Sequence, residues 1–386
     1  PAADRGLRYR VPVLGRAVAV RARALLAGLT GAARGFAALG AALALGAAAS
    51  APATNAPVPS APGVTAASAF GVGPWREAVV SVADLDKSAA WLIEDGGWQE
   101  VAAGPLSRAE IAYWKLPDTA AGAFRLICAA GVETGCIRFV RFDNAGPQRP
   151  IRLAARPWDT GGIFSIMLRS EDVQALFDAA IARGWWAESE PYRFAFGGSQ
   201  LVNVVVQGPH GVNYALYQRS APPFTDFPVG RLSQAFNSMR MVKDQPRSLA
   251  WYREVLGFAT LFDAPYTDPE PRPNNFSVPA NLATGIVRQA AVVQPMLPGE
   301  TGRIEVMQFV GLAGRDLSAQ ASPPNFGIIS VRYPVRAFAA YMAHLRARGA
   351  APAYQAQEVA ITALGVVDIA ALRDPDGNLT EFYAAP

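Results

Sequence analysis

The chain has 386 residues, 51% of them hydrophobic, and its 35 basic and 31 acidic residues give a formal net charge of +4. Seven arginines and one acid lie in residues 1–50, so the remainder carries 28 basic and 30 acidic residues, a net charge of −2. The length favours two domains. A slightly acidic body without a basic run argues against nucleic acid as a partner.

Residues 1–50 have the pattern of an export leader. Arginines precede the uncharged stretch 35–49 of Ala, Gly, Leu and Phe, and small residues follow it. Residues 51–73 are rich in Pro, Ala and Ser and predict a disordered linker. We therefore expect export to a bacterial periplasm or beyond, with membrane contact only through an uncleaved leader. The alternative for the leader is an ordinary alanine-rich helix.

A repeat with an offset of 160 residues fixes the first predicted elements. Residues 79–101 and 238–261 each read as a strand, a capping Asp, an amphipathic helix and a glycine that ends the helix. The paired positions are Asp84 with Asp244, Ser88 with Ser248, Trp91 with Trp251, and Gly97 with Gly257.

The two cysteines of the chain lie close together in the sequence. Cys128 and Cys136 flank a short insert with two glycines, as on neighbouring strands of a hairpin. They predict either a disulfide in an oxidising compartment or two buried thiols.

A second repeat alternates with the first. Residues 176–184 resemble 341–349, and 208–217 resemble 374–383, each reading as a helix ended by glycine and then strands. The chain therefore contains four strand–helix–strands units. A Pro-rich stretch at 220–230 separates an expected N-terminal domain, residues 74–219, from an expected C-terminal domain, residues 231–386.

The segments LAWYREVLGF (249–258) and RDPDGNLTEFY (373–383) resemble signature segments of the vicinal oxygen chelate superfamily. That superfamily includes glyoxalase I, extradiol dioxygenases and bleomycin-resistance proteins. The resemblance implies an α+β fold in which four βαβββ modules form two eight-stranded, partly open barrel-like cups. It covers about residues 75–386 and is stronger in the third and fourth units.

The resemblance also implies where a divalent metal would be held, by side chains on the first and last strands of paired modules. The expected positions in the N-terminal domain are Glu77, Arg138, Ala215 and a position at or next to Ser165. Those in the C-terminal domain are Asn237, Glu305, Glu381 and a position at or next to Phe326. None is histidine, which argues against an iron-dependent extradiol dioxygenase and predicts no cofactor beyond a weakly held divalent metal.

Glu305 and Glu381 are the expected catalytic pair and the only metal candidates, because they are the carboxylates on both last strands of the C-terminal domain. Asn237, Glu77 and Arg138 are expected ligand-binding residues. Tyr192, Phe194 and Phe196 alternate on one face of a strand, which predicts either a cup lining or ordinary core.

Two functions follow for a small, apolar or aromatic organic molecule. One is a binding protein of the antibiotic-resistance type that needs only shape and stacking. The other is a lyase or isomerase of the glyoxalase type that depends on a divalent metal or on paired carboxylates. The absent histidines favour the first, or a metal-free enzyme. A third interpretation makes the N-terminal cup a scaffold that has lost its site.

Overall fold

The computed structural model describes residues 65–196, 198–225, 227–296 and 299–385. The predicted leader and residues 51–64 of the predicted linker lie outside this part of the chain. The prediction of a disordered linker fails for residues 65–73, where α1 (Ala66–Ala69) forms and the buried Val72 bridges to Val335. No described helix is long and apolar enough to cross a membrane.

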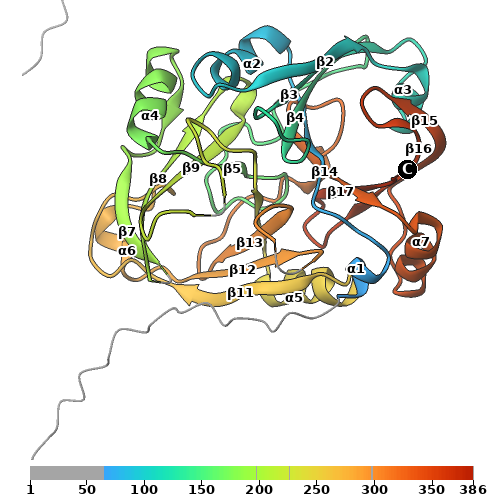
Figure 1. Ribbon diagram of the computed structural model, residues 1–386. Coiled ribbons are helices and arrows are strands. Elements are labelled where there is room, and N and C mark those ends of the chain that lie inside the picture. Colours follow the sequence, from blue (N-terminus) through green and yellow to red (C-terminus); the bar gives the residue numbers. More distant parts are fainter. Residues whose placement is uncertain (1–64, 197, 226, 297–298, 386) are drawn as a thin grey trace, which may run out of the picture. The chain divides into compact units, whose positions relative to one another are not determined.

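Four βαβββ modules follow one another along the chain, as the fold class required (Figure 1). Module 1 contains β1 (Glu77–Ser81), α2 (Leu85–Glu94), β2 (Gln99–Pro105), α3 (Arg108–Tyr113), β3 (Ala121–Cys128) and β4 (Cys136–Asp143). Module 2 contains β5 (Ser165–Arg169), α4 (Val173–Ala182), β6 (Trp186–Ala187), β7 (Tyr192–Phe196), β8 (Ser199–Gln207) and β9 (Asn213–Ala221). Module 3 contains β10 (Asn237–Met241), α5 (Gln245–Ala250), β11 (Ala259–Tyr266), α6 (Ala280–Ala283), β12 (Arg288–Gln294) and β13 (Arg303–Phe309). Module 4 contains β14 (Gly327–Val335), α7 (Phe338–Ala347), β15 (Tyr354–Ile361), β16 (Gly365–Arg373) and β17 (Leu379–Ala384).

The helix boundaries agree with the repeat. The carboxylates of Asp84 and Asp244 accept hydrogen bonds from the backbone N–H groups of Lys87 and Arg247, at 2.9 and 3.0 Å. These side chains satisfy donors that the first helical turn leaves free. Gly257 follows the second of these helices with φ +71°, a conformation that glycine adopts without a steric penalty.

The cysteines form a disulfide, the first of the two alternatives that their spacing left open. Cys128 ends β3, Cys136 begins β4, and the two strands pair antiparallel with Ile127 opposite Ile137. The Cα atoms of the two cysteines lie 4.4 Å apart.

The pairing of the modules differs from the expected division into residues 74–219 and 231–386. The eight-stranded sheet joins modules 1 and 4 in the order β15-β16-β17-β14-β1-β4-β3-β2. The nine-stranded sheet joins modules 3 and 2 in the order β11-β12-β13-β10-β5-β9-β8-β6, with β7 also paired to β8. We call the first the outer-module cup and the second the inner-module cup. In the middle of each sheet the first strands of the two modules pair antiparallel and join them, β1 with β14 and β10 with β5.

Neighbouring modules nevertheless touch through their helices. The Trp91 indole on α2 donates to the carbonyl of Leu176 on α4, at 3.3 Å. The Tyr341 hydroxyl on α7 likewise donates to the carbonyl of Leu256, at 2.8 Å. Modules 1 and 2, and likewise modules 3 and 4, therefore pack through their helices, whereas modules 1 and 4, and modules 2 and 3, share a sheet.

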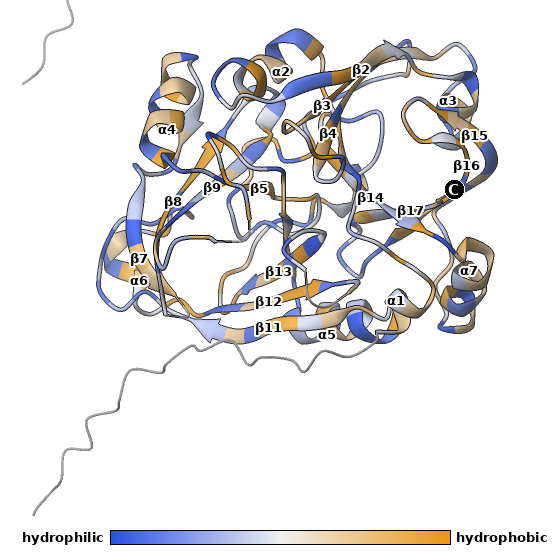
Figure 2. Ribbon diagram, viewed as in Figure 1, coloured by the Kyte–Doolittle hydropathy of each residue, from blue (hydrophilic) through white to orange (hydrophobic). Residues whose placement is uncertain are grey.

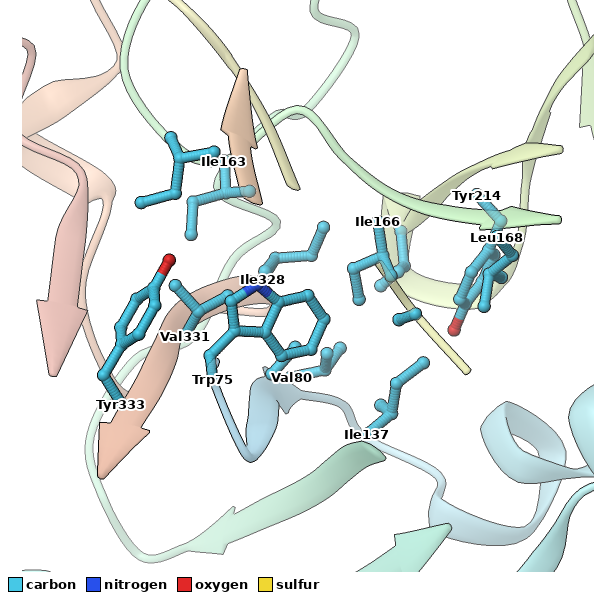
Figure 3. Packing of buried hydrophobic residues seen from close by; sticks show 14 of the residues in the cluster. Trp75, Val80, Ile137, Ile163, Ile166, Leu168, Tyr214, Ile328, Val331 and Tyr333 are labelled. Carbon is cyan, nitrogen blue, oxygen red and sulfur yellow. The ribbon is translucent and has the colours of Figure 1, made fainter. Parts of the chain in front are cut away.

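One hydrophobic core extends across both cups. Figure 3 shows Ile137 of module 1 and Ile166 of module 2 in this core, beside the fully buried Trp75. The Trp75 indole donates to the carbonyl of Arg303 in module 3. In Figure 2 hydrophobic residues are concentrated on strands such as β8 and β12, and hydrophilic residues appear on the helices α2 and α4. Burial of a shared apolar layer therefore holds the two sheets together.

Candidate functional site

The outer-module cup has an ion cluster where the resemblance placed metal ligands. Arg332 on β14 lies opposite Glu77 on β1, and Glu381 on β17 lies beside Arg332. The Nη1 of Arg332 donates to Oε1 of Glu77 at 2.9 Å, and its Nε donates to Oε2 of Glu381 at 2.7 Å. The Nε of Arg138 on β4 also donates to Oε1 of Glu77, at 2.7 Å. All four side chains are fully buried.

These contacts set the charges of the cluster. Burial opposes ionisation of Glu77, but the adjacent guanidinium groups of Arg138 and Arg332 lower its pKa overall. Burial instead raises the pKa of Glu381, although Arg332 acts in the opposite direction. Both guanidinium groups pair with buried carboxylates, and Arg332 also lies 3.5 Å from Glu110, so these carboxylates are engaged by the protein's own cations rather than arranged to hold a metal. The residues of this cup do not fit the metal of the superfamily.

The inner-module cup has a different set at the equivalent positions. Asn237 on β10 lies opposite Met167 on β5, Met167 lies beside Ala215 on β9, and Glu305 on β13 lies beside Met239. The four equivalent positions are therefore Glu305, which is the single carboxylate, the amide Asn237, and the two residues Met167 and Ala215, which offer no oxygen or nitrogen ligand. Three or four nitrogen, sulfur or oxygen ligands are usual around a divalent metal. The residues of this cup also do not fit a tightly held metal, and among the described residues no group of three His, Cys, Asp or Glu side chains is arranged to hold one.

The inner-module cup encloses a cavity of about 480 Å³. Nine aromatic rings and three methionines line most of it: Tyr192, Phe194, Phe196, Tyr217, Phe224, Phe236, Phe262, Tyr266, Phe276, Met167, Met239 and Met307. Tyr192, Phe194 and Phe196, which share one face of β7, are thus cup lining. A volume and lining of this kind are typical of a small-ligand site.

Glu305 lies on the wall of this cavity. Its Oε2 accepts a hydrogen bond from Nδ2 of Asn237 at 3.2 Å, and both residues line the cavity. Burial raises the pKa of Glu305 to about 7, and the bond from Asn237 offsets only part of this effect. Glu305 is therefore able to hold or release a proton near neutral pH.

Arginines supply positive charge to the same cavity. Arg169, two residues after Met167 on β5, is 5% exposed and pairs with Glu300 through Nη2 at 2.7 Å. Its guanidinium carbon lies 4.1 to 4.6 Å from the ring centres of Phe224, Phe227 and Phe236. Arg288 on β12 also lines the cavity, and its Nη2 pairs with Asp268 at 2.8 Å.

The structure separates the two carboxylates that we expected to act together. Glu305 borders the cavity of the inner-module cup, whereas Glu381 lies in the buried ion cluster of the outer-module cup. Asn237 accompanies Glu305 as expected, and Glu77 and Arg138 belong with Glu381. The expectation that Glu305 and Glu381 converge on one site is wrong, because modules 3 and 4 do not share a sheet.

Two of the expected positions were also out of register. Met167 replaces Ser165 and Arg332 replaces Phe326 as the first-strand residues that meet their partners across the cups. In modules 2 and 4 the facing residue lies five residues before the helix cap, Asp172 or Ala337, whereas in modules 1 and 3 it lies seven residues before the cap. Arg169 was not predicted as a site residue either, although it lies two residues after Met167 on β5, which places both side chains on the same face of the strand.

The comparisons with known proteins agree with this fold. The family described as Glyoxalase/Bleomycin resistance protein/Dioxygenase superfamily matches residues 236–382. Glyoxalase I from Zea mays superposes with a TM-score of 0.53 at 16% identity, over 81% of this chain and 92% of that chain. A variant of the maize enzyme gives 0.52 at 17% identity, over 83% and 97% of the two chains. No curated protein sequence matches the chain.

Proposed function

We propose that the chain binds a small aromatic or apolar organic molecule in the inner-module cup without a tightly held metal, as a relative of the glyoxalase/bleomycin resistance/dioxygenase superfamily whose model matches residues 236–382. The observation that carries this proposal is the cavity of about 480 Å³, which the buried carboxyl group of Glu305 lines together with aromatic rings and methionines. In the outer-module cup the equivalent positions are instead taken by the buried ion cluster of Glu77, Arg138, Arg332 and Glu381.

The lining supports recognition by stacking and apolar contact. Aromatic rings contribute large apolar areas and favour tilted or offset ring pairs. Existing pairs such as Phe196 with Phe262, whose ring centres lie 5.2 Å apart, leave other ring surfaces to the cavity. Methionines adapt to ligands of different outline. These contacts are sufficient for a binding protein of the antibiotic-resistance type.

Glu305 favours a second candidate, a metal-free lyase or isomerase. A carboxyl group with a pKa of about 7 can remove a proton from a carbon acid and return it at a neighbouring atom, with no net change in the enzyme. Asn237 would orient Glu305 through the existing hydrogen bond. A metal-dependent glyoxalase reaction has less support, because Met167 and Ala215 occupy two of the four ligand positions.

Export to an oxidising compartment remains part of the proposal. It is supported by the leader-like pattern of residues 1–50 and by the Cys128–Cys136 disulfide, since disulfides persist in secreted and periplasmic proteins. N-terminal sequencing of protein recovered from the native host should begin within residues 47–61. A recovered chain that retains residues 5–34 would refute export.

Binding can be tested with N-phenyl-1-naphthylamine, an uncharged aromatic dye that becomes fluorescent in apolar sites. We expect saturable binding of one dye per chain. Ala290 lines the cavity from β12, so Ala290→Trp should fill the space and abolish binding. The matched control, Ala340→Trp on the exposed face of α7, should bind the dye normally. Absence of saturable binding, or equal binding by both variants, would refute the proposed site.

A further inference from the structure

We infer that the ligand of the inner-module cup is an aromatic carboxylic acid in its ionised form, and that Arg169 is its anion-binding residue. This inference rests on the proposed function and specifies the ligand class. The starting observation is that Nη1 of Arg169 is buried and has no hydrogen-bond partner among the residues that the structure describes. A buried guanidinium N–H without a partner is costly, and a ligand acceptor in the cavity would satisfy it.

The surroundings of Arg169 are positive. Arg219 on β9 lines the same cavity, and both guanidinium groups lie on the ring of Phe224, at 4.6 Å for Arg169 and 3.6 Å for Arg219. The Nε of Arg219 is also buried without a partner in the described part of the chain. Among the described acidic residues, Glu300 alone pairs with this group of cations.

Arg303 does not compete for the same role. Its Nε donates to Oε1 of Gln294 at 3.2 Å, and its Nη2 donates to the carbonyl of Gly299 at 2.8 Å and contacts Glu300 at 3.2 Å. Its Nε and Nη2 groups are therefore already paired inside the protein. Glu300 is shared between Arg169 and Arg303, so within the described part of the chain one paired carboxylate offsets two positive charges, and Arg219 adds a third. A ligand carboxylate would offset the excess and relieve the repulsion between the guanidinium groups.

The geometry also indicates how the acid would lie. Arg169 and Met167 are two residues apart on β5, as Arg303 and Glu305 are on β13, a spacing of roughly 7 Å along a strand. A carboxylate on Arg169 would therefore place the aromatic body over Met167 and within reach of Glu305. Phe224, Phe227 and Phe236 hold the guanidinium in place and exclude water, which strengthens its interaction with an anion.

The test compares acids with their neutral amides. Naphthalene-2-carboxylate and 3-phenylpropionate, each with the matching carboxamide, are titrated as competitors of N-phenyl-1-naphthylamine at pH 8. We expect each acid to bind at least about tenfold more tightly than its amide, the equivalent of about 1.4 kcal/mol. Arg169→Gln should abolish this preference while the amides keep their affinity. Arg169→Lys should retain part of it, because the charge remains but the planar donor pair is lost.

Two further variants keep the inference falsifiable if Arg169→Gln does not fold. Glu300 is exposed and competes with a ligand for Arg169, so Glu300→Gln should fold and should increase the affinity for the acids several-fold, with the amides unchanged. Arg183 pairs with Glu94 and Asp95 outside the cavity, so Arg183→Gln should change neither affinity.

The outcomes separate the two proposals. Equal displacement of the dye by acid and amide, or no response to Glu300→Gln, would overturn the role of Arg169 while leaving the cup as a binding site. Failure of the dye itself to bind would instead overturn the proposed function.

Discussion

Glu77 and Arg332 lie directly opposite each other on β1 and β14, and their side chains join the first and fourth modules through a fully buried ion pair of 2.9 Å. In related folds the equivalent side chains are expected to hold a metal. Here Arg332 is a cation. Glu77 also pairs with Arg138, and Arg332 also pairs with Glu381. The four facing positions of the outer-module cup are thus taken by charged side chains that pair with one another.

Replacement of Arg332 should strongly destabilise the folded protein. Arg332→Ala would leave the carboxyl groups of Glu77 and Glu381 buried without their shared partner, and we expect a loss of about 3–5 kcal/mol in the free energy of unfolding. Arg125→Ala is the matched control, because Arg125 pairs with the exposed Asp86 and should contribute less than about 1 kcal/mol. Urea unfolding at pH 7 measures both. A similar small loss for the two variants would show that the buried cluster contributes little.

Neither cup should bind a divalent metal tightly as the chain stands. Added Zn²⁺ or Ni²⁺ should leave the melting temperature of the protein unchanged. The variant that combines Met167→His, Ala215→Glu and Asn237→His should differ, because with Glu305 it presents four ligands at the facing positions of the inner-module cup. We expect Zn²⁺ to raise its melting temperature by several degrees and a chelator to reverse the shift. Stoichiometric zinc in the unaltered protein would contradict the prediction.

The free energy of unfolding should depend on pH through the carboxyl group of Glu305. The pKa of this group is about 7 in the folded chain and near 4.5 when exposed, so the folded state retains a proton that the unfolded state has lost between these values. The contribution of Glu305 is therefore complete below about pH 4.5, falls as the pH rises to about 7, and is constant above that. Relative to Glu305→Gln, the loss should reach up to roughly 3 kcal/mol. Parallel stability curves for the two proteins across this range would contradict the raised pKa.

The disulfide should stabilise the β3–β4 hairpin modestly, because it closes a short loop. The double variant Cys128→Ala, Cys136→Ala should lose about 2–3 kcal/mol. Oxidised protein should be two hydrogens lighter by mass than the reduced form. A reducing agent should destabilise the unaltered protein and leave the double variant unaffected. If both cysteines of oxidised protein react with an alkylating agent, the bond is absent.

Much of the fold was determined by the sequence alone, because its signals act over short distances. Asp84 and Asp244 satisfy backbone donors three residues away, and Gly257 ends its helix by adopting a positive φ. The spacing of Cys128 and Cys136 allowed a disulfide across one hairpin. Repetition of these local signals established four βαβββ modules, and with them the fold class.

The tertiary structure decided which modules share a sheet. The first strands of all four modules present similar hydrogen-bonding edges, so the local pattern is compatible with either pairing, and the long connections such as residues 144–164 permit both. Only the complete packing selects modules 1 with 4 and 2 with 3. That selection places Arg332 beside Glu77 and Glu381, and leaves Glu305 with Asn237 and Arg169 around an aromatic cavity. Pairing between distant strand edges is a property of the whole chain, and a candidate site built across such a pairing cannot be assigned from local sequence.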